Sequence, residues 1–164
     1  MTNSDTPKQY LRDLYFADMA RQVAKRSKCS SRQVGAVIVV DGSIVSEGYN
    51  GSPRGSSMCQ DPTQKCRRQQ KGFRSGEGLE HCPAVHAEAN AIAQAARNGI
   101  QVRGATLYVW PCLPCKWCVG LMVNAGIARL VHVHEEPYDE MADLLLDESE
   151  IVRHVVFRED VDAL

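Results

Sequence analysis

Segments with the apolar spacing of helices alternate along this chain with short apolar segments rich in β-branched residues. Between Tyr10 and Arg26 apolar residues recur every three or four positions, which predicts an amphipathic helix. The run 34–40 predicts a strand, and Asp41-Gly42 predicts a hairpin turn into a second strand at 43–48. Further helices are predicted at 84–98, 115–125 and 138–146, and further strands at 105–110, 128–134 and 151–157. This order predicts an α/β fold, a three-layer α/β/α sandwich around a mixed five-stranded sheet.

Length and composition favour one compact domain. The chain has 164 residues, of which 44% are hydrophobic and 24% charged, enough for one apolar core. We therefore expect a single domain over residues 1–164 with a long irregular loop at 50–82. No run of about 18 apolar residues is present to span a bilayer, and the polar N-terminus lacks the apolar region of a secretory signal. The sequence thus predicts a cytoplasmic protein with no membrane partner.

The charges of the chain nearly cancel, with 19 basic and 20 acidic side chains. A general nucleic-acid binder needs a basic surface to attract phosphates, so no nucleic-acid partner is expected. Basic residues do gather within the loop, at Lys65, Arg67, Arg68, Lys71 and Arg74. This run is compatible with a solvated loop face and with contact to a phosphate group.

Seven cysteines form an odd set, which is unfavourable for complete disulfide pairing. In a reducing compartment, clustered thiols more often bind metal or take part in catalysis. Cys115 and Cys118 are three residues apart at the start of a predicted helix, where they face the same way and the helix N-terminus favours thiolates. Upstream, His86 stands near the start of another predicted helix. Two thiolates and one imidazole leave the fourth position of a tetrahedral zinc open, as in a catalytic site.

Glu88 follows His86 by two residues and is not needed as a ligand. Zinc lowers the pKa of a bound water to roughly 7, and a nearby carboxylate can take that proton and return it to a substrate. The combined pattern His-x-Glu…Pro-Cys-x-x-Cys is similar to the signature of zinc-dependent nucleobase deaminases. Taken singly, each of these residues is compatible with an ordinary core position, but the combination favours a catalytic zinc site.

A second register of the cysteine motif overlaps the first, because Cys112 and Cys115 also follow the Pro-Cys-x-x-Cys pattern. The apolar helix pattern begins directly after Cys118, which places Cys115 and Cys118 together in the first turn. We therefore predict that Cys115 and Cys118 bind the metal and that Cys112 lies in the approach loop.

Several further motifs accompany the zinc pattern between Tyr10 and His134. They are Gln33-Val34-Gly35-Ala36, Gly48-Tyr49-Asn50-Gly51-Ser52-Pro53, His86-Ala87-Glu88-Ala89-Asn90-Ala91, Thr106-Leu107-Tyr108 and Asn124-Ala125-Gly126-Ile127. Together they resemble the cytidine deaminase superfamily, and more closely its deoxycytidylate (dCMP) deaminase branch. One departure is the approach to Cys115, Val-Trp-Pro-Cys-Leu-Pro, which is about one residue longer than the usual family run.

The resemblance implies a cytidine deaminase-like fold and hydrolysis of dCMP to dUMP and ammonia, which supplies dUMP for thymidylate synthesis. In this chain His86, Cys115 and Cys118 would hold one catalytic Zn²⁺, and Glu88 would carry a proton to N3 of cytosine. Asn50 would hydrogen-bond the nucleotide. Its alternative is a turn residue with left-handed backbone before Gly51.

The phosphate of such a substrate requires a contact, for which the segment after the first helix offers Arg26, Ser27, Lys28 and Arg32. Spacing does not choose among them. The resemblance also implies a regulatory site near Gly48–Pro53, activated by dCTP and inhibited by dTTP with Mg²⁺, and assembly into a homo-oligomer.

A second, structural Zn²⁺ is also implied by resemblance to some dCMP deaminases. Its expected ligands are Cys29, Cys59, His81 and Cys82, with Cys66 as the first substitute. Such a cross-link would order a long loop that has no core of its own. Free buried or surface thiols are the alternative.

Three other functions remain as alternatives. A tRNA adenosine deaminase shares the zinc site but should have a basic face for RNA, which the near-neutral charge does not favour. Deamination of a free nucleoside or nucleobase would show no preference for a phosphate. A noncatalytic zinc-stabilised interaction module is disfavoured because Glu88 is present.

Overall fold

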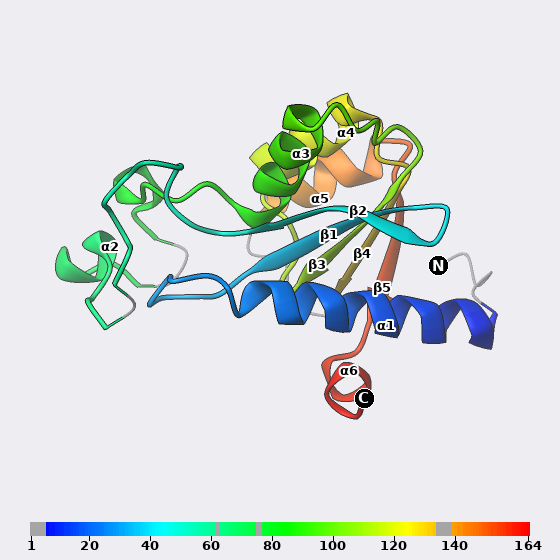
Figure 1. Cartoon of the computed structure of the whole chain (residues 1–164), viewed down its shortest axis with the longest axis horizontal. Coiled ribbons are helices and arrows are strands. Elements are labelled where there is room, and N and C mark those ends of the chain that lie inside the picture. The colour runs from blue at the N-terminus through cyan, green and yellow to red at the C-terminus, as the bar shows by residue number, and fades with distance from the viewer. Residues whose placement is uncertain (1–5, 62, 75–76, 134–138) are drawn as a thin grey trace.

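A computed structural model describes residues 6–61, 63–74, 77–133 and 139–164 (Figure 1). Its strands are β1 (Gly35–Val40), β2 (Ser43–Tyr49), β3 (Thr106–Trp110), β4 (Arg129–Val133) and β5 (Val152–Val156). Its helices are α1 (Pro7–Ala24), α2 (Arg67–Gln70), the 3₁₀ helix η1 (Leu79–His81), α3 (Ala87–Arg97), α4 (Lys116–Ala125), α5 (Glu140–Asp147) and α6 (Arg158–Asp162). The nine predicted elements are thus all present, with ends shifted by a few residues.

The five strands form one mixed sheet in the order β2-β1-β3-β4-β5. β1 pairs antiparallel with β2 and β3, whereas β3, β4 and β5 run parallel. The predicted hairpin turn joins β1 to β2, where Asp41 and Gly42 both have positive φ, at 48° and 77°. Asp and Gly tolerate this backbone conformation, which matches the twist of a hairpin.

Helices cover both faces of the sheet, and each face has its own apolar core. Figure 1 shows α1 on one face and α3, α4 and α5 on the other. On the α1 side the core includes Phe16, Val37 and Tyr108, whereas the opposite core includes Ile38 and Leu107. Neighbouring strand residues thus point to opposite faces, as a pleated sheet requires. The predicted three-layer α/β/α sandwich is confirmed.

Close backbone contact between α3 and the sheet depends on Gly48. A Cβ atom at this position would lie 2.2 Å from the Ala87 carbonyl oxygen and 2.3 Å from the Ala91 nitrogen. Since both atoms belong to the backbone of α3, no side-chain movement could relieve the overlap. Only glycine lets α3 approach β2 this closely, and this contact fixes the helix that carries Glu88.

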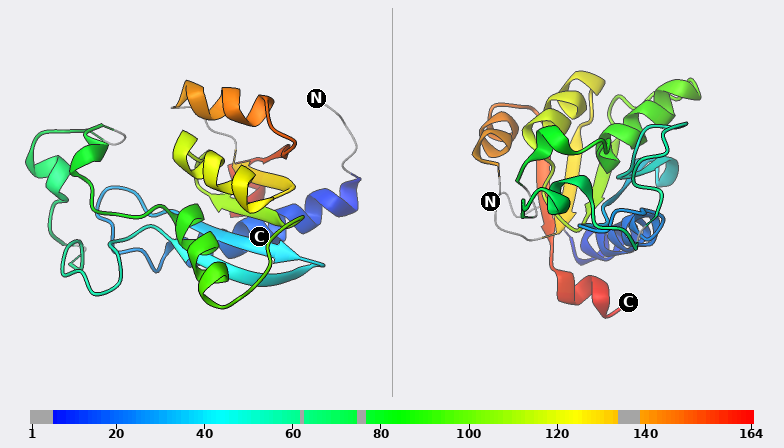
Figure 2. Two further views of the ribbon diagram at one scale, coloured as in Figure 1. Left: turned by 90° about the horizontal axis from the view of Figure 1, so that it is seen from above. Right: turned by 90° about the vertical axis from the view of Figure 1, so that its left-hand side faces the viewer.

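The segment 50–82 projects beyond the layered part of the molecule (Figure 2). It was expected to be irregular, but it contains the short helices α2 and η1. The C-terminal helix α6 was also not predicted, because its five residues are too few to show an apolar period. The predicted ends at His134 and Tyr138 lie outside the described residues. No described helix has the length and apolar content needed to cross a membrane.

Candidate metal centre and substrate pocket

The beginnings of two helices bring the predicted zinc ligands together. His86 is the N-cap residue of α3, and Cys115 is the N-cap residue of α4. Cys118 lies in the first turn of α4 and is buried. The two helices pack against each other on the same face of the sheet. Residues far apart in sequence therefore meet because their helices begin side by side.

The distances between the ligand atoms fit a tetrahedral zinc ion. His86 Nδ1 lies 3.3 Å from Cys115 Sγ and 3.5 Å from Cys118 Sγ. Zinc bonds of about 2.3 Å to sulfur and 2.0 Å to nitrogen place tetrahedral ligands roughly 3.5 Å apart. Among the described residues, this is the only group of three metal-binding side chains whose ligand atoms all lie within 4.8 Å of one another. It contains Cys118 and not Cys112, as the helix pattern predicted.

Charge distribution within this group also favours metal binding. Hydrogen bonds with Cys118 and His86 lower the pKa of the Cys115 thiol to about 4. The hydrogen bond with Cys115 raises the pKa of His86, and the same neighbour raises that of Cys118 because the two thiols share a proton. The environment thus favours the thiolate form of Cys115. A bound zinc ion would deprotonate both sulfurs.

Glu88 lies beside this centre and is 3% exposed. Burial raises the pKa of its carboxyl group above the ordinary value. A buried carboxyl group beside a set of metal ligands can serve as a general acid–base. Glu88 is therefore the candidate for this role.

A pocket opens onto Glu88 and His86 and is also lined by Asn50. Both ends of the Asn50 amide bind the backbone: Nδ2 donates to the Arg32 carbonyl at 2.9 Å, and Oδ1 accepts from the Val34 nitrogen at 2.8 Å. The φ of Asn50 is not positive, which contradicts the left-handed turn alternative. Ser27 Oγ donates to the Asn50 carbonyl at 2.7 Å. This hydrogen bond from Ser27 helps to fix the backbone of Asn50 in place.

The cationic residues that were candidates for phosphate contact occupy different places. Arg26 pairs with Glu47 and stacks over the Tyr49 ring, in a groove outside the pocket of Glu88. Lys28 lines another cavity and donates to Gln60 at 3.3 Å. Arg32 does line the pocket of Glu88, and so does Arg68 from the loop. The basic run in the loop indicated that a cation from this segment could contact a phosphate. The sequence could not show which of its residues lines the pocket.

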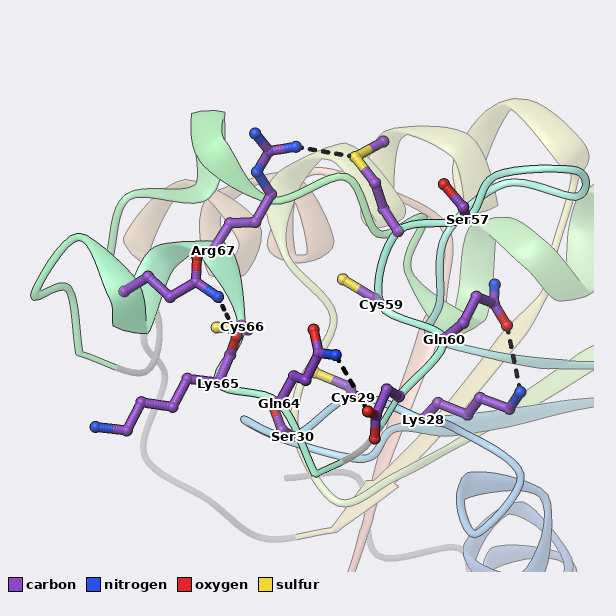
Figure 3. Close-up of a pocket in the computed structure, with 13 residues that line it drawn as sticks. Lys28, Cys29, Ser30, Ser57, Cys59, Gln60, Gln64, Lys65, Cys66 and Arg67 are labelled. Atoms are coloured by element: carbon purple, nitrogen blue, oxygen red, sulfur yellow. Dashed lines mark hydrogen bonds between the residues drawn. The ribbon is translucent and has the colours of Figure 1, made fainter.

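The other thiols gather around the loop. A cavity here called the thiol cavity is lined by Cys29, Cys59 and Cys66, which Figure 3 shows around one space. Burial raises the pKa of the Cys59 thiol, and the neighbouring thiols Cys82, Cys29 and Cys66 raise it further. His81 instead stacks near Phe73 and has Nε2 at 3.6 Å from a Glu80 oxygen. All seven cysteines are free thiols.

Comparison with known proteins gives matches over most of the chain. Residues 11–134 match the family described as the cytidine and deoxycytidylate deaminase zinc-binding region. A deoxycytidylate deaminase of Mycobacterium phage D29 is 40% identical over 128 residues, covering 75% of this chain and 94% of the relative. That of Schizosaccharomyces pombe is 38% identical over 120 residues, covering 73% of this chain but 36% of the relative. The match thus spans about a third of the yeast protein and nearly all of the phage protein.

Solved structures support the same fold. The dCMP deaminase of cyanophage S-TIM5, in complex with dCMP and dUMP, has a TM-score of 0.69 and 23% identity. The alignment covers 93% of this chain and 99% of that structure. Its apo form has a TM-score of 0.64. The sheet and its flanking helices are therefore those of a cytidine deaminase-like fold.

Proposed function

Because the chain belongs to the cytidine and deoxycytidylate deaminase family, we propose that it hydrolyses dCMP to dUMP and ammonia. The observation that carries this proposal is the pairing of the His86–Cys115–Cys118 group with a buried Glu88 at one pocket. Several relatives that are 36–40% identical to this chain over the aligned residues are named deoxycytidylate deaminases. The product dUMP would supply thymidylate synthesis.

Each residue of the site has a separate role in this reaction. His86, Cys115 and Cys118 would hold a zinc ion, which when bound would supply the acidity that makes water a nucleophile near neutral pH. Glu88 takes a proton from the attacking water and delivers it to N3 of the cytosine ring while the water oxygen bonds to C4. Glu88 then carries the proton of the new C4 hydroxyl group to the leaving amino group. The bond from C4 to nitrogen breaks, and ammonia departs. The Asn50 side chain would stabilise the pocket lining through its hydrogen bonds with the backbone of Arg32 and Val34.

Ammonia release measured against several substrates tests the proposal. The panel contains dCMP, CMP, deoxycytidine and an adenosine tRNA stem-loop, each with the zinc-loaded protein. We expect dCMP to have the highest kcat/KM. Preference for the stem-loop would support the tRNA deaminase alternative, preference for deoxycytidine would support a nucleoside deaminase, and no turnover of any substrate would support a noncatalytic module.

A second, structural zinc ion at the thiol cavity is also part of the proposal. Cys29, Cys59 and Cys82 are retained as ligands, and Cys66 is favoured over His81 because it neighbours Cys59 whereas His81 packs against Phe73. Thiolates are the preferred ligands of structural zinc. These sulfurs are more widely spaced than the catalytic group, so the metal would draw the loop together. Metal analysis should find two zinc ions per chain, and one ion per chain would reject the second site.

Nucleotide regulation would use the groove that Gly48, Tyr49 and Ser52 line. This groove also carries Arg26, Arg54 and Arg97, whose charges suit a triphosphate. The proposed effectors are dCTP as activator and dTTP with Mg²⁺ as inhibitor. A substrate curve that stays hyperbolic and does not respond to dCTP would reject this regulation.

Assembly and location complete the proposed function. We expect a homo-oligomer, supported by the exposure of Trp117 and Leu121 on the outer face of α4. Sedimentation of the zinc-loaded protein measures its mass, and a monomer at micromolar concentration would contradict the expectation. The free state of all seven cysteines supports a cytoplasmic location.

A further inference from the structure

Arg68 is an unusual residue of the loop because its guanidinium group is buried without a carboxylate partner. Its exposed fraction is 7%. Among the described residues no ion pair joins it to an acid, and its three hydrogen bonds go to neutral oxygens. Burying a cation with neutral partners alone is costly, because neutral oxygens replace only part of its hydration. An anion from outside the chain would balance this charge.

The donors of Arg68 show which edge of the group is available. Nη1 donates to the carbonyl oxygens of Arg74 at 3.0 Å and Glu77 at 2.6 Å, and Nη2 donates to Ser31 Oγ at 3.2 Å. Its Nε is the one buried side-chain nitrogen or oxygen, among the described residues, that has no hydrogen-bond partner. A guanidinium group has five N–H donors, so three are used and two remain. Nε–H and an Nη2–H form the paired edge that binds a phosphate through two oxygens.

Arg68 also faces the candidate substrate pocket, because it lines the same pocket as His86, Glu88 and Asn50. Glu88 is the only carboxylate among the residues that line this pocket, whereas Arg32 adds a second cation. A nucleotide with its base at Glu88 would therefore extend its phosphate toward positive charge. Resting on the proposed function, we propose that Arg68 binds the 5′-phosphate of the substrate and sets the preference for a nucleotide over a nucleoside.

The test compares two substrates that differ only in the phosphate. kcat/KM is measured for dCMP and deoxycytidine with the wild type, Arg68→Gln, Arg68→Lys and the control Lys71→Gln, all zinc-loaded. Lys71→Gln removes an exposed charge from the same loop and should change neither value. Arg68→Gln should lower kcat/KM for dCMP about 100-fold, mainly through KM, because it removes two charge-assisted hydrogen bonds. The value for deoxycytidine should stay within about twofold, since deoxycytidine makes neither bond.

Titration calorimetry with dUMP and deoxyuridine provides the same comparison without turnover. An equal loss of affinity for dUMP and for deoxyuridine would show that Arg68 only anchors the loop, and would overturn the proposal. An unchanged affinity for dUMP would overturn it as well. If Arg68→Gln does not fold, Arg68→Lys decides: its point charge lacks the paired edge, so the ratio of dCMP to deoxycytidine activity should fall at least about fivefold. A wild type inactive on dCMP but active on deoxycytidine would reject the proposed function itself, and Arg68 with it.

Discussion

The catalytic centre and the thiol cavity use the same kind of side chain but differ in what holds those side chains in place. The catalytic ligands stand on the N-termini of α3 and α4, two helices packed on the sheet, and their atoms lie within 4.8 Å of one another. The thiols of the cavity are half-buried: Cys59 and Cys66 lie on a loop whose longest helix has four residues, and Cys29 lies in the segment after α1. Packed helices thus preorganise a metal site, whereas a metal proposed at the thiol cavity would have to order the loop as it binds.

The largest effect is expected from Cys118→Ser at the catalytic centre. Loss of one thiolate from the preorganised group should remove one zinc ion per chain and abolish measurable turnover. Metal analysis and ammonia release measure both. Cys112→Ser is the matched control, since Cys112 is buried nearby but lies outside the ligand group. It should retain the zinc and the activity, and the reverse outcome would show that Cys112, and not Cys118, is the zinc ligand.

Glu88→Gln should separate metal binding from proton transfer. The amide has nearly the shape of the carboxyl group but cannot accept the proton, so kcat should fall about 10⁴-fold. The zinc content should stay unchanged because Glu88 is not a ligand. A fully active Glu88→Gln enzyme with its zinc in place would refute the mechanism.

Gly48→Ala should weaken the support of the catalytic centre without touching a ligand. The added Cβ would meet the backbone of α3 at Ala87 and Ala91, and overlap of this kind costs about 2 kcal/mol. For a chain of this length that lowers Tm by about 6 °C, and activity should fall as Glu88 moves. Gly51→Ala is the control, because its Cβ would meet only the Tyr49 ring at 3.9 Å. Thermal unfolding of both variants makes the comparison.

Cys59→Ser should have the smallest effect, on the loop alone. If the thiol cavity holds a structural zinc, the variant should lose that one ion, and Tm should fall by about 5 °C. The catalytic zinc should remain bound, since its ligands belong to the packed helices. An unchanged metal content and an unchanged Tm would mean that Cys29, Cys59, Cys66 and Cys82 bind no zinc in the working protein.

The zinc ligands and Glu88 were predictable because their signals are local. A spacing of three residues places two cysteines in one helical turn, and Glu88 stands two positions after His86. The order of strands and helices was predictable for the same reason, since apolar period depends on neighbours in sequence. The five-residue helix α6 was not, because it is shorter than the pattern that would reveal it.

The sandwich, the catalytic zinc group and the choice of Cys118 over Cys112 could all be predicted from the sequence, because they rest on short-range spacing. The folded chain was needed to show that Arg68, among the basic residues of the loop, lines the pocket of Glu88, and that Gly48 lets α3 pack against β2. The reason is that the path of a loop and the approach of a helix to a sheet depend on contacts between distant residues. Such contacts leave no period or spacing in the sequence.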